Sequence, residues 1–278
     1  MVEEIEEKAR VNRIEGAAGL ELMEFLDKVD FPVLRSIFED IAERSGVDVE
    51  ALNVITSDRI AYYPSPVRTG PAAWYSAGEN IITMRSDLIR ERAQEKFHVP
   101  ADIFALLILC HEEVHATSCV ECRGLEMTEG EFRYKRERVG YHSEVWEKVG
   151  DTPALRRWFF HLLEEGVTER LGLEVFREYI RRTGFADKKT LIDFDKAVDE
   201  HKGEMVYDVP VQLVNALIMK ISQEADIPEK AVWEAIVRGK YEGEDLTNPE
   251  LRESFAEMIG PEFLDRLSRA NSDEELRE

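Results

Sequence analysis

The chain has 278 residues and carries 58 acidic against 36 basic side chains, a net charge of -22 at pH 7. A chain of this length can bury a sizeable core without disulfide or metal staples. The negative charge opposes binding to nucleic-acid phosphates and to anionic membrane surfaces, and the lysines and arginines form no basic patch that would override it. We therefore expect no nucleic-acid partner and no membrane partner.

The ends of the chain and its cysteines suggest a cytoplasmic protein. The N-terminal sequence lacks the basic start and apolar core of a signal peptide, and no apolar run reaches the roughly 18 residues that a membrane span needs. Cys110, Cys119 and Cys122 are an odd number of cysteines close together, which does not resemble a disulfide framework. The CxxC of Cys119 and Cys122 leaves a redox or metal pair open, but ordinary thiols are the simpler interpretation because no second CxxC follows.

Hydrophobic periodicity predicts the elements in chain order. Apolar residues at helical spacing indicate two helices in the first 45 residues, broken at Phe31-Pro32. Between residues 50 and 85, four short β-branched or aromatic runs alternate with Pro and Gly and predict a small sheet: ALNVITS, RIAYYP, AAWYS and NIITMR. After Pro100 the helical spacing returns, and we expect helices near residues 101–120, 131–147, 153–182, 206–223, 228–238, 248–259 and 261–270.

This order predicts an α+β fold that is predominantly helical, with a small mixed sheet before a central helix and a helical C-terminal part. We expect an N-terminal subdomain over residues 1–150, holding the sheet and that helix, and a helical C-terminal subdomain over residues 151–278. The densest basic cluster has glutamates interspersed and is interpreted as the solvated face of the 131–147 helix. It consists of Arg133, Lys135, Arg136 and Arg138.

The stretch ILCHEEVHATS, residues 108–118, places charge at the end of a helix that is apolar on all sides. His111 and His115 are four residues apart, so on a helix they lie on one face and can share an ion. Glu112 lies beside them, where a general base for a metal-activated water belongs. Burying these groups without a partner would be costly, and a divalent cation removes that cost, so we predict one Zn²⁺ per chain. Glu113 points about 100° further round the helix and has no predicted role.

A catalytic zinc commonly has three protein ligands, so a third must come from elsewhere. The extended HExxHxxGxxH pattern fails, because Ser118 and Glu121 occupy the glycine and final histidine positions. The remaining candidates are Glu121, Glu126, His142, His161 and the glutamates of HLLEEGVTER. We favour the last group, in which Glu165 and Glu169 are four apart on an apolar helix. One of them could bind zinc while the other orients a ligand histidine.

The motif HEEVHA followed by EEGVTE resembles the gluzincin zinc metallopeptidases, in which HExxH is followed on a later helix by a ligand glutamate. The resemblance implies a zincin-like fold with His111, His115 and Glu165 as zinc ligands. It also implies Glu112 as general base and proton shuttle, and Glu169 as the partner of a ligand histidine.

The same resemblance implies two further features. A strand before the active-site helix should line the cleft and pair with an extended substrate, and GENIITM, residues 78–84, is the candidate. A downstream side chain should stabilise the oxyanion, for which Tyr207 is the first candidate, with His142 and Tyr179 as alternatives. The spacing between HExxH and Glu165 is longer than in compact gluzincins, so residues 120–150 are expected to form a loop or helical excursion that returns to the zinc.

The leading hypothesis is a zinc-dependent metallopeptidase that hydrolyses peptide bonds with a metal-activated water, with Glu112 as general base and a peptide or protein as substrate. The alternative is a catalytically inactive zinc-containing regulatory or protein-binding module. In a third interpretation the chain is zinc-free and its HExxH is a coincidence. A digestion assay with and without chelator separates the first two, and metal analysis tests the third.

Overall fold

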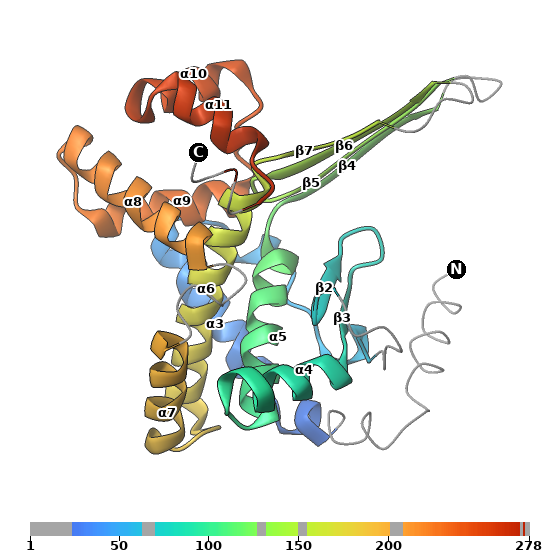
Figure 1. The fold of residues 1–278 in the computed structure, drawn as a ribbon, viewed down its shortest axis with the longest axis vertical. Coiled ribbons are helices and arrows are strands. Elements are labelled where there is room, and N and C mark those ends of the chain that lie inside the picture. The colour runs from blue at the N-terminus through green and yellow to red at the C-terminus, as the bar shows by residue number, and fades with distance from the viewer. Residues whose placement is uncertain are drawn as a thin grey trace. The chain divides into compact units, whose positions relative to one another are not determined.

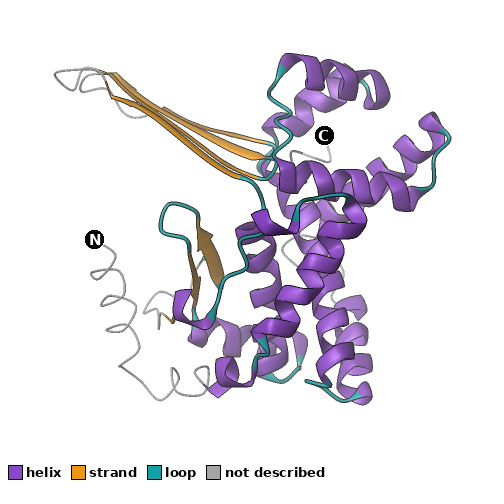
Figure 2. Ribbon diagram, turned by 180° about the vertical axis from the view of Figure 1, so that it is seen from behind, coloured by secondary structure: helices purple, strands orange, loops and turns teal. Residues whose placement is uncertain are grey.

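The structure is a computed structural model that describes residues 24–62, 70–126, 132–149, 155–200, 208–272 and 275. These residues are predominantly helical, with two small sheets, which agrees with the expected α+β class (Figures 1 and 2). None of the described helices is long and apolar enough to cross a membrane.

Contacts divide the chain into two compact units, and each is discontinuous in sequence. The first consists of Met1–Ile41, Ala51–Thr117 and Leu171–Val206. The second consists of Ala42–Glu50, Ser118–Arg170 and Tyr207–Glu278. This division differs from the single boundary after residue 150 that we expected from the sequence.

The first unit contains a long buried helix, α5 (Ala101–Thr117), together with other helices or parts of helices. They include α3 (Phe31–Ser45), α4 (Ser86–Arg92), the C-terminal part of α6 (His161–Thr183) and α7 (Lys188–Glu200). Along α5 the side chains of Ala105, Leu106 and Leu109 are all fully buried. Helix α5 was predicted from its apolar run, whereas α7 was not among the predicted helices. The described helical residues 24–28 end just before α3, close to the predicted break.

The sheet of the first unit has the strand order β1-β3-β2, with β1 (Ile60–Tyr62) parallel and β2 (Ala73–Ser76) antiparallel to β3 (Ile81–Met84). The predicted small mixed sheet is therefore present, although ALNVITS forms no strand in it. Strand β3, the core of GENIITM, is central and hydrogen-bonds on both sides. The prediction that it pairs with a substrate is therefore wrong, because a paired strand has no backbone groups left to offer.

The sheet of the second unit is an antiparallel meander of β4 (Val120–Glu126), β5 (Phe132–Val139), β6 (His142–Val149) and β7 (Leu155–Phe159). It overturns the predicted helix at 131–147, the start of the one at 153–182, and the loop or helical excursion expected over residues 120–150. The sequence signal was a two-residue hairpin loop after Val139, in which Gly140 has a φ of +55°.

The basic cluster on β5 is correspondingly not a solvated helix face. Arg138 is 6% exposed and its guanidinium donates to Glu121 at 3.1 Å. Arg136 donates to Asp245 at 2.6 Å. Because charges that alternate along a strand can satisfy helical spacing by chance, the pattern at this position favoured the wrong element.

The helices of the second unit match the sequence prediction closely. They are the N-terminal part of α6, α8 (Asp208–Ala225), α9 (Glu229–Glu242), α10 (Pro249–Ile259) and α11 (Pro261–Arg269). Gly166 on α6 lies directly against the backbone carbonyl of Pro210 on α8, where a Cβ would clash. The glycine of the EEGVTE motif therefore has a packing role, because it lets two helix backbones approach closely.

A half-buried carboxylate on α6, that of Glu178, should make the stability of the first unit depend on pH. Arg181 donates a hydrogen bond to Glu178 at 2.7 Å, as does Arg182, and chiefly the Arg181 hydrogen bonds lower the pKa of Glu178 to about 2. A lowered folded-state pKa contributes stability above the unfolded pKa and loses it as pH falls toward 2. After a discount for solvent screening, we expect about 1 kcal/mol.

We expect Glu178→Gln to remove this contribution. Denaturant unfolding at pH 7 and at pH 2.5 should show an acid-induced loss of stability that is smaller in the variant than in the parent by about 1 kcal/mol. An unchanged pH dependence would contradict this assignment.

Candidate metal centre

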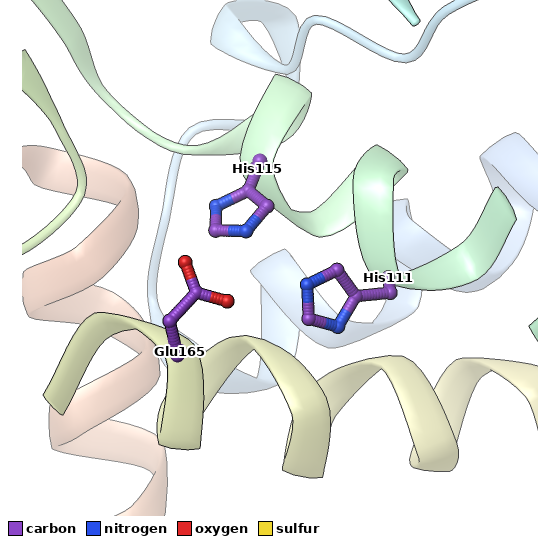
Figure 3. A group of neighbouring side chains, drawn as sticks. All are labelled: His111, His115 and Glu165. Atoms are coloured by element: carbon purple, nitrogen blue, oxygen red, sulfur yellow. The ribbon is translucent and has the colours of Figure 1, made fainter. Parts of the chain in front are cut away.

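His111 and His115 lie one turn apart near the C-terminal end of α5, and their ring centroids are 5.0 Å apart. Glu165, from the first turns of α6, brings its carboxylate to the same place (Figure 3). One ligand atom from each of the three side chains lies within 4.8 Å of the other two. The residues therefore form a group that could hold a metal ion, as the sequence predicted for these three positions.

A glycine on α6 explains why the two helices come so close. A Cβ at Gly172 would lie 3.2 Å from the Cα of His111, tighter than ordinary van der Waals contact. Glu165 precedes Gly172 by seven residues, two turns of helix, and therefore lies on the same face of α6. The close backbone contact and the regular helix together direct Glu165 toward the histidine pair.

The donor set suits zinc. Two imidazoles and one carboxylate are the protein ligands of one well-known class of catalytic zinc site, which leaves a fourth position for water. Ligand atoms at about 2.1 Å from one ion can be at most about 4.2 Å apart. The spread of up to 4.8 Å would therefore close by small side-chain rotations on binding. Because Glu165 is only 7% exposed, a cation there would also offset the cost of burying its charge.

The two glutamates between the histidines are both buried, with exposures of 6% for Glu112 and 0% for Glu113. The sequence indicated no role for Glu113, and the structure provides one. Its Oε2 accepts the backbone N–H of Ile55 at 2.9 Å. Burial raises the pKa of Glu113 well above its usual value. Glu113 thus joins α5 to the segment that precedes β1.

A polar network holds the last turn of α5 in place. The side-chain amide of Asn53 donates to the carbonyl of Ala116 at 3.1 Å and to Oδ1 of Asn80 at 2.7 Å. The Tyr75 hydroxyl donates to the same Asn80 oxygen at 2.9 Å. Because Ala116 follows His115 directly, these bonds anchor the histidine-bearing turn to the sheet of the first unit.

The N-terminal turn of α6 is anchored by a buried ion pair next to Glu165. Lys240 is fully buried and its ammonium binds Glu164, which is 1% exposed. Lys240 also donates to the Thr168 hydroxyl at 2.8 Å, and Glu164 accepts the backbone N–H of Tyr141 at 2.9 Å. Three elements of the second unit, α6, α9 and the β5–β6 loop, therefore meet at one carboxylate.

The outcome differs among the other residues that were predicted to belong to the site. Glu169 lies one turn after Glu165 on α6, and its assignment as a partner of a ligand histidine stays a prediction. Tyr207 and the Glu126 side chain lie outside the described part of the chain. The Tyr179 hydroxyl accepts the backbone N–H of Asp30 at 2.7 Å, a structural role within the first unit.

The other candidate third ligands do not join the metal group found among the described residues. Glu121 forms ion pairs with Arg123 and Arg138. Burial raises the pKa of Glu121, but the hydrogen bonds and charges of the two arginines together outweigh burial, so that the pKa is lowered. His142 and His161 lie together at the start of β6 and of α6, with ring centroids 5.2 Å apart. Burial and then the neighbouring His161 lower the pKa of His142.

The two cysteines of the CxxC have different surroundings. Cys122 lies on β4 opposite Glu137, whereas the Cys119 sulfur faces the Arg138 guanidinium at 3.9 Å. Because neighbouring positions of a strand point to opposite faces, residues 119 and 122 lie on opposite sides of the sheet. All three cysteines are free thiols.

No family model matches the chain, and neither a search of curated proteins nor one of solved structures finds a match. The class that fold and site define is therefore an α+β protein with a candidate His₂Glu metal centre.

Proposed function

We propose that the chain is a zinc-dependent metallopeptidase, similar to the gluzincins in the way its ligands are arranged. One observation supports the proposal above the others. A carboxylate fifty residues beyond His115 joins a histidine pair whose helix also carries Glu112. A chance HExxH on a buried helix would not require a third ligand of the right chemistry beside it.

The proposed chemistry follows from the residues around the site. His111, His115 and Glu165 would hold the zinc, which polarises the scissile carbonyl and makes a water acidic. Glu112 would take a proton from the attacking water while the new bond from oxygen to the carbonyl carbon forms. The same carboxyl would then return the proton to the amine as the C–N bond breaks. The products are a carboxylic acid and an amine, and water is the only reactant besides the peptide.

Strand β2 is the best place for an extended substrate to pair. It is an edge strand of the first unit's sheet and packs against α5. The backbone N–H of Arg85 donates to the Ala72 carbonyl at 2.7 Å, so these two residues form a hydrogen-bonded pair. Along two antiparallel strands, hydrogen-bonded pairs of facing residues alternate with pairs that are not hydrogen-bonded. In this register Ala73 and Met84 form a non-hydrogen-bonded pair, so the backbone N–H and C=O groups of Ala73 point away from β3. We propose that a peptide pairs with these groups.

The proposal is tested by metal analysis and digestion of a peptide library on one preparation. We expect one zinc per chain, cleavage that a chelator abolishes, and recovery when zinc is restored. One bound zinc without cleavage of any peptide would instead support a regulatory or protein-binding module. A preparation that binds no zinc would leave HExxH a coincidence and exclude both functions.

A further inference from the structure

A cluster of three rings lies beside Glu165, within the second unit. The His161 imidazole is 5.2 Å from that of His142 and 5.4 Å from the Trp158 ring, measured between centroids. Its Nδ1 is 3.8 Å from Oε1 of Glu165, one helical turn further along α6. The metal group and the proposed chemistry both leave His161 and His142 without a role.

The backbone around His161 is unusual, which indicates that its position is constrained. Phe160, directly before it, has a φ of +56°, a left-handed conformation that is rare for a bulky residue. Phe160 is fully buried and its N–H donates to the Ser268 carbonyl at 3.0 Å. The chain thus turns sharply between β7 and α6, so that His161 becomes the first residue of the helix that carries Glu165.

Neighbouring rings hold the His161 imidazole on two sides. Trp158 precedes it on β7 and His142 opens β6, so both neighbours come from the antiparallel sheet. The Nδ1 atom of His142 is buried and has no hydrogen-bond partner among the described residues, and the His142 ring packs against those of Trp158 and His161. These ring contacts favour the observed orientation, in which Nδ1 of His161 lies 3.8 Å from Oε1 of Glu165.

A carboxylate that binds a metal through one oxygen needs a donor at the other to fix its orientation. At 3.8 Å, Nδ1 of His161 is too far from Oε1 for a hydrogen bond, which requires about 3.2 Å or less. The ligand atoms of the metal group must also converge by a few tenths of an ångström when an ion binds. A small rotation of Glu165 can serve both adjustments.

We propose that His161 is a positioning residue for the metal centre, which donates a hydrogen bond from Nδ1 to the Glu165 carboxylate and is held in place by His142 and Trp158. This proposal rests on the metal centre of the proposed function. In this proposal His161 orients the zinc ligand Glu165. The role predicted for Glu169, as the partner of a ligand histidine, is a separate one. His161 would affect hydrolysis only through the position of Glu165.

The test is zinc affinity, measured on metal-free protein by competition with a chromophoric chelator. His161→Asn places an amide nitrogen near the position of Nδ1, His161→Gln places one near Nε2, and His161→Phe keeps a ring without a donor. We expect zinc binding about 10–100-fold weaker for the Gln and Phe variants. The Asn variant should stay within about threefold of the parent, because it keeps the donor.

His98→Asn is the matched control, since His98 is exposed and has a φ of +51°, a conformation that asparagine tolerates. It should bind zinc as the parent does. Thermal unfolding of the metal-free variants shows whether each one is folded. Substitution with Co²⁺ adds a spectrum that reports the ligand geometry, which should change for Gln and Phe but not for Asn.

The outcomes separate the two proposals. If the parent binds zinc and all three His161 variants bind it equally well, the positioning role is wrong while the metal centre stands. Equal losses in the Asn and Phe variants would also refute the role, because the hydrogen-bond donor would then not matter. If the parent itself binds no zinc, it is the proposed function that fails.

Discussion

Replacing Glu112 with glutamine should lower kcat/KM for any peptide that the parent cleaves by about 10²–10⁴-fold, while one zinc per chain stays bound. Glutamine keeps the size of the side chain but cannot accept a proton from water. Because Glu112 is adjacent to the ligands without being one of them, the metal content should not change. The measurement is steady-state hydrolysis together with metal analysis of the same sample.

The neighbouring residue provides a matched control. Glu113→Gln is the same change one position along α5, at a side chain that is also buried. Its raised pKa means that the carboxyl is already easy to protonate, and a glutamine oxygen can still accept the Ile55 N–H. We expect nearly parental hydrolysis. Full activity in Glu112→Gln would refute the proposed mechanism, and equal losses in both variants would show that the effect is structural.

Replacing Lys240 with methionine should lower the free energy of unfolding by about 3–5 kcal/mol, because it leaves the Glu164 carboxylate buried without its cation. Lys240 is fully buried, and burial lowers its pKa against the opposing effect of Glu164. The loss should appear as a lower midpoint of denaturation at unchanged m-value.

The double variant Glu164→Gln with Lys240→Met separates charge from packing. Glutamine at 164 is neutral and its oxygen can still accept the Tyr141 N–H. We expect it to recover most of the stability that Lys240→Met loses, since replacing both partners of a buried ion pair is often nearly neutral. If the double variant is less stable than Lys240→Met alone, the unpaired charge is not the cause. A loss below about 1 kcal/mol for Lys240→Met would show that the pair contributes little.

Local pattern was sufficient for most helices and for part of the candidate site. The apolar run before His111 predicted α5, and the spacing of four placed His111 and His115 on one face. The pair Glu165 and Glu169 was also favoured, because two carboxylates on one face of a helix require a partner, and the resemblance to the gluzincins implied Glu165 as the ligand. In each case the pattern lies within a single helix, where the helical repeat determines which side chains share a face.

The same periodicity failed where pairing is non-local. The 132–149 segment carries charges that fit a helix as well as a strand, and only its partners β4 and β7 make it a sheet. GENIITM was correctly predicted as a strand, but whether it is central or at the edge depends on β1 and β2. His161 was identified in the sequence, yet its proximity to Glu165 and His142 depends on the turn at Phe160.

The sequence by itself therefore determined that this chain has a buried helix ending in a histidine pair, with Glu112 beside it and a later helix rich in carboxylates. The tertiary structure decided which carboxylate joins the pair, which glutamate is structural, and which strands lie at the edge of the sheet that the described residues form. The physical reason is that helical spacing is a property of neighbouring residues. Ligand convergence, by contrast, depends on close approaches such as that of Gly172 to His111, which no local pattern encodes.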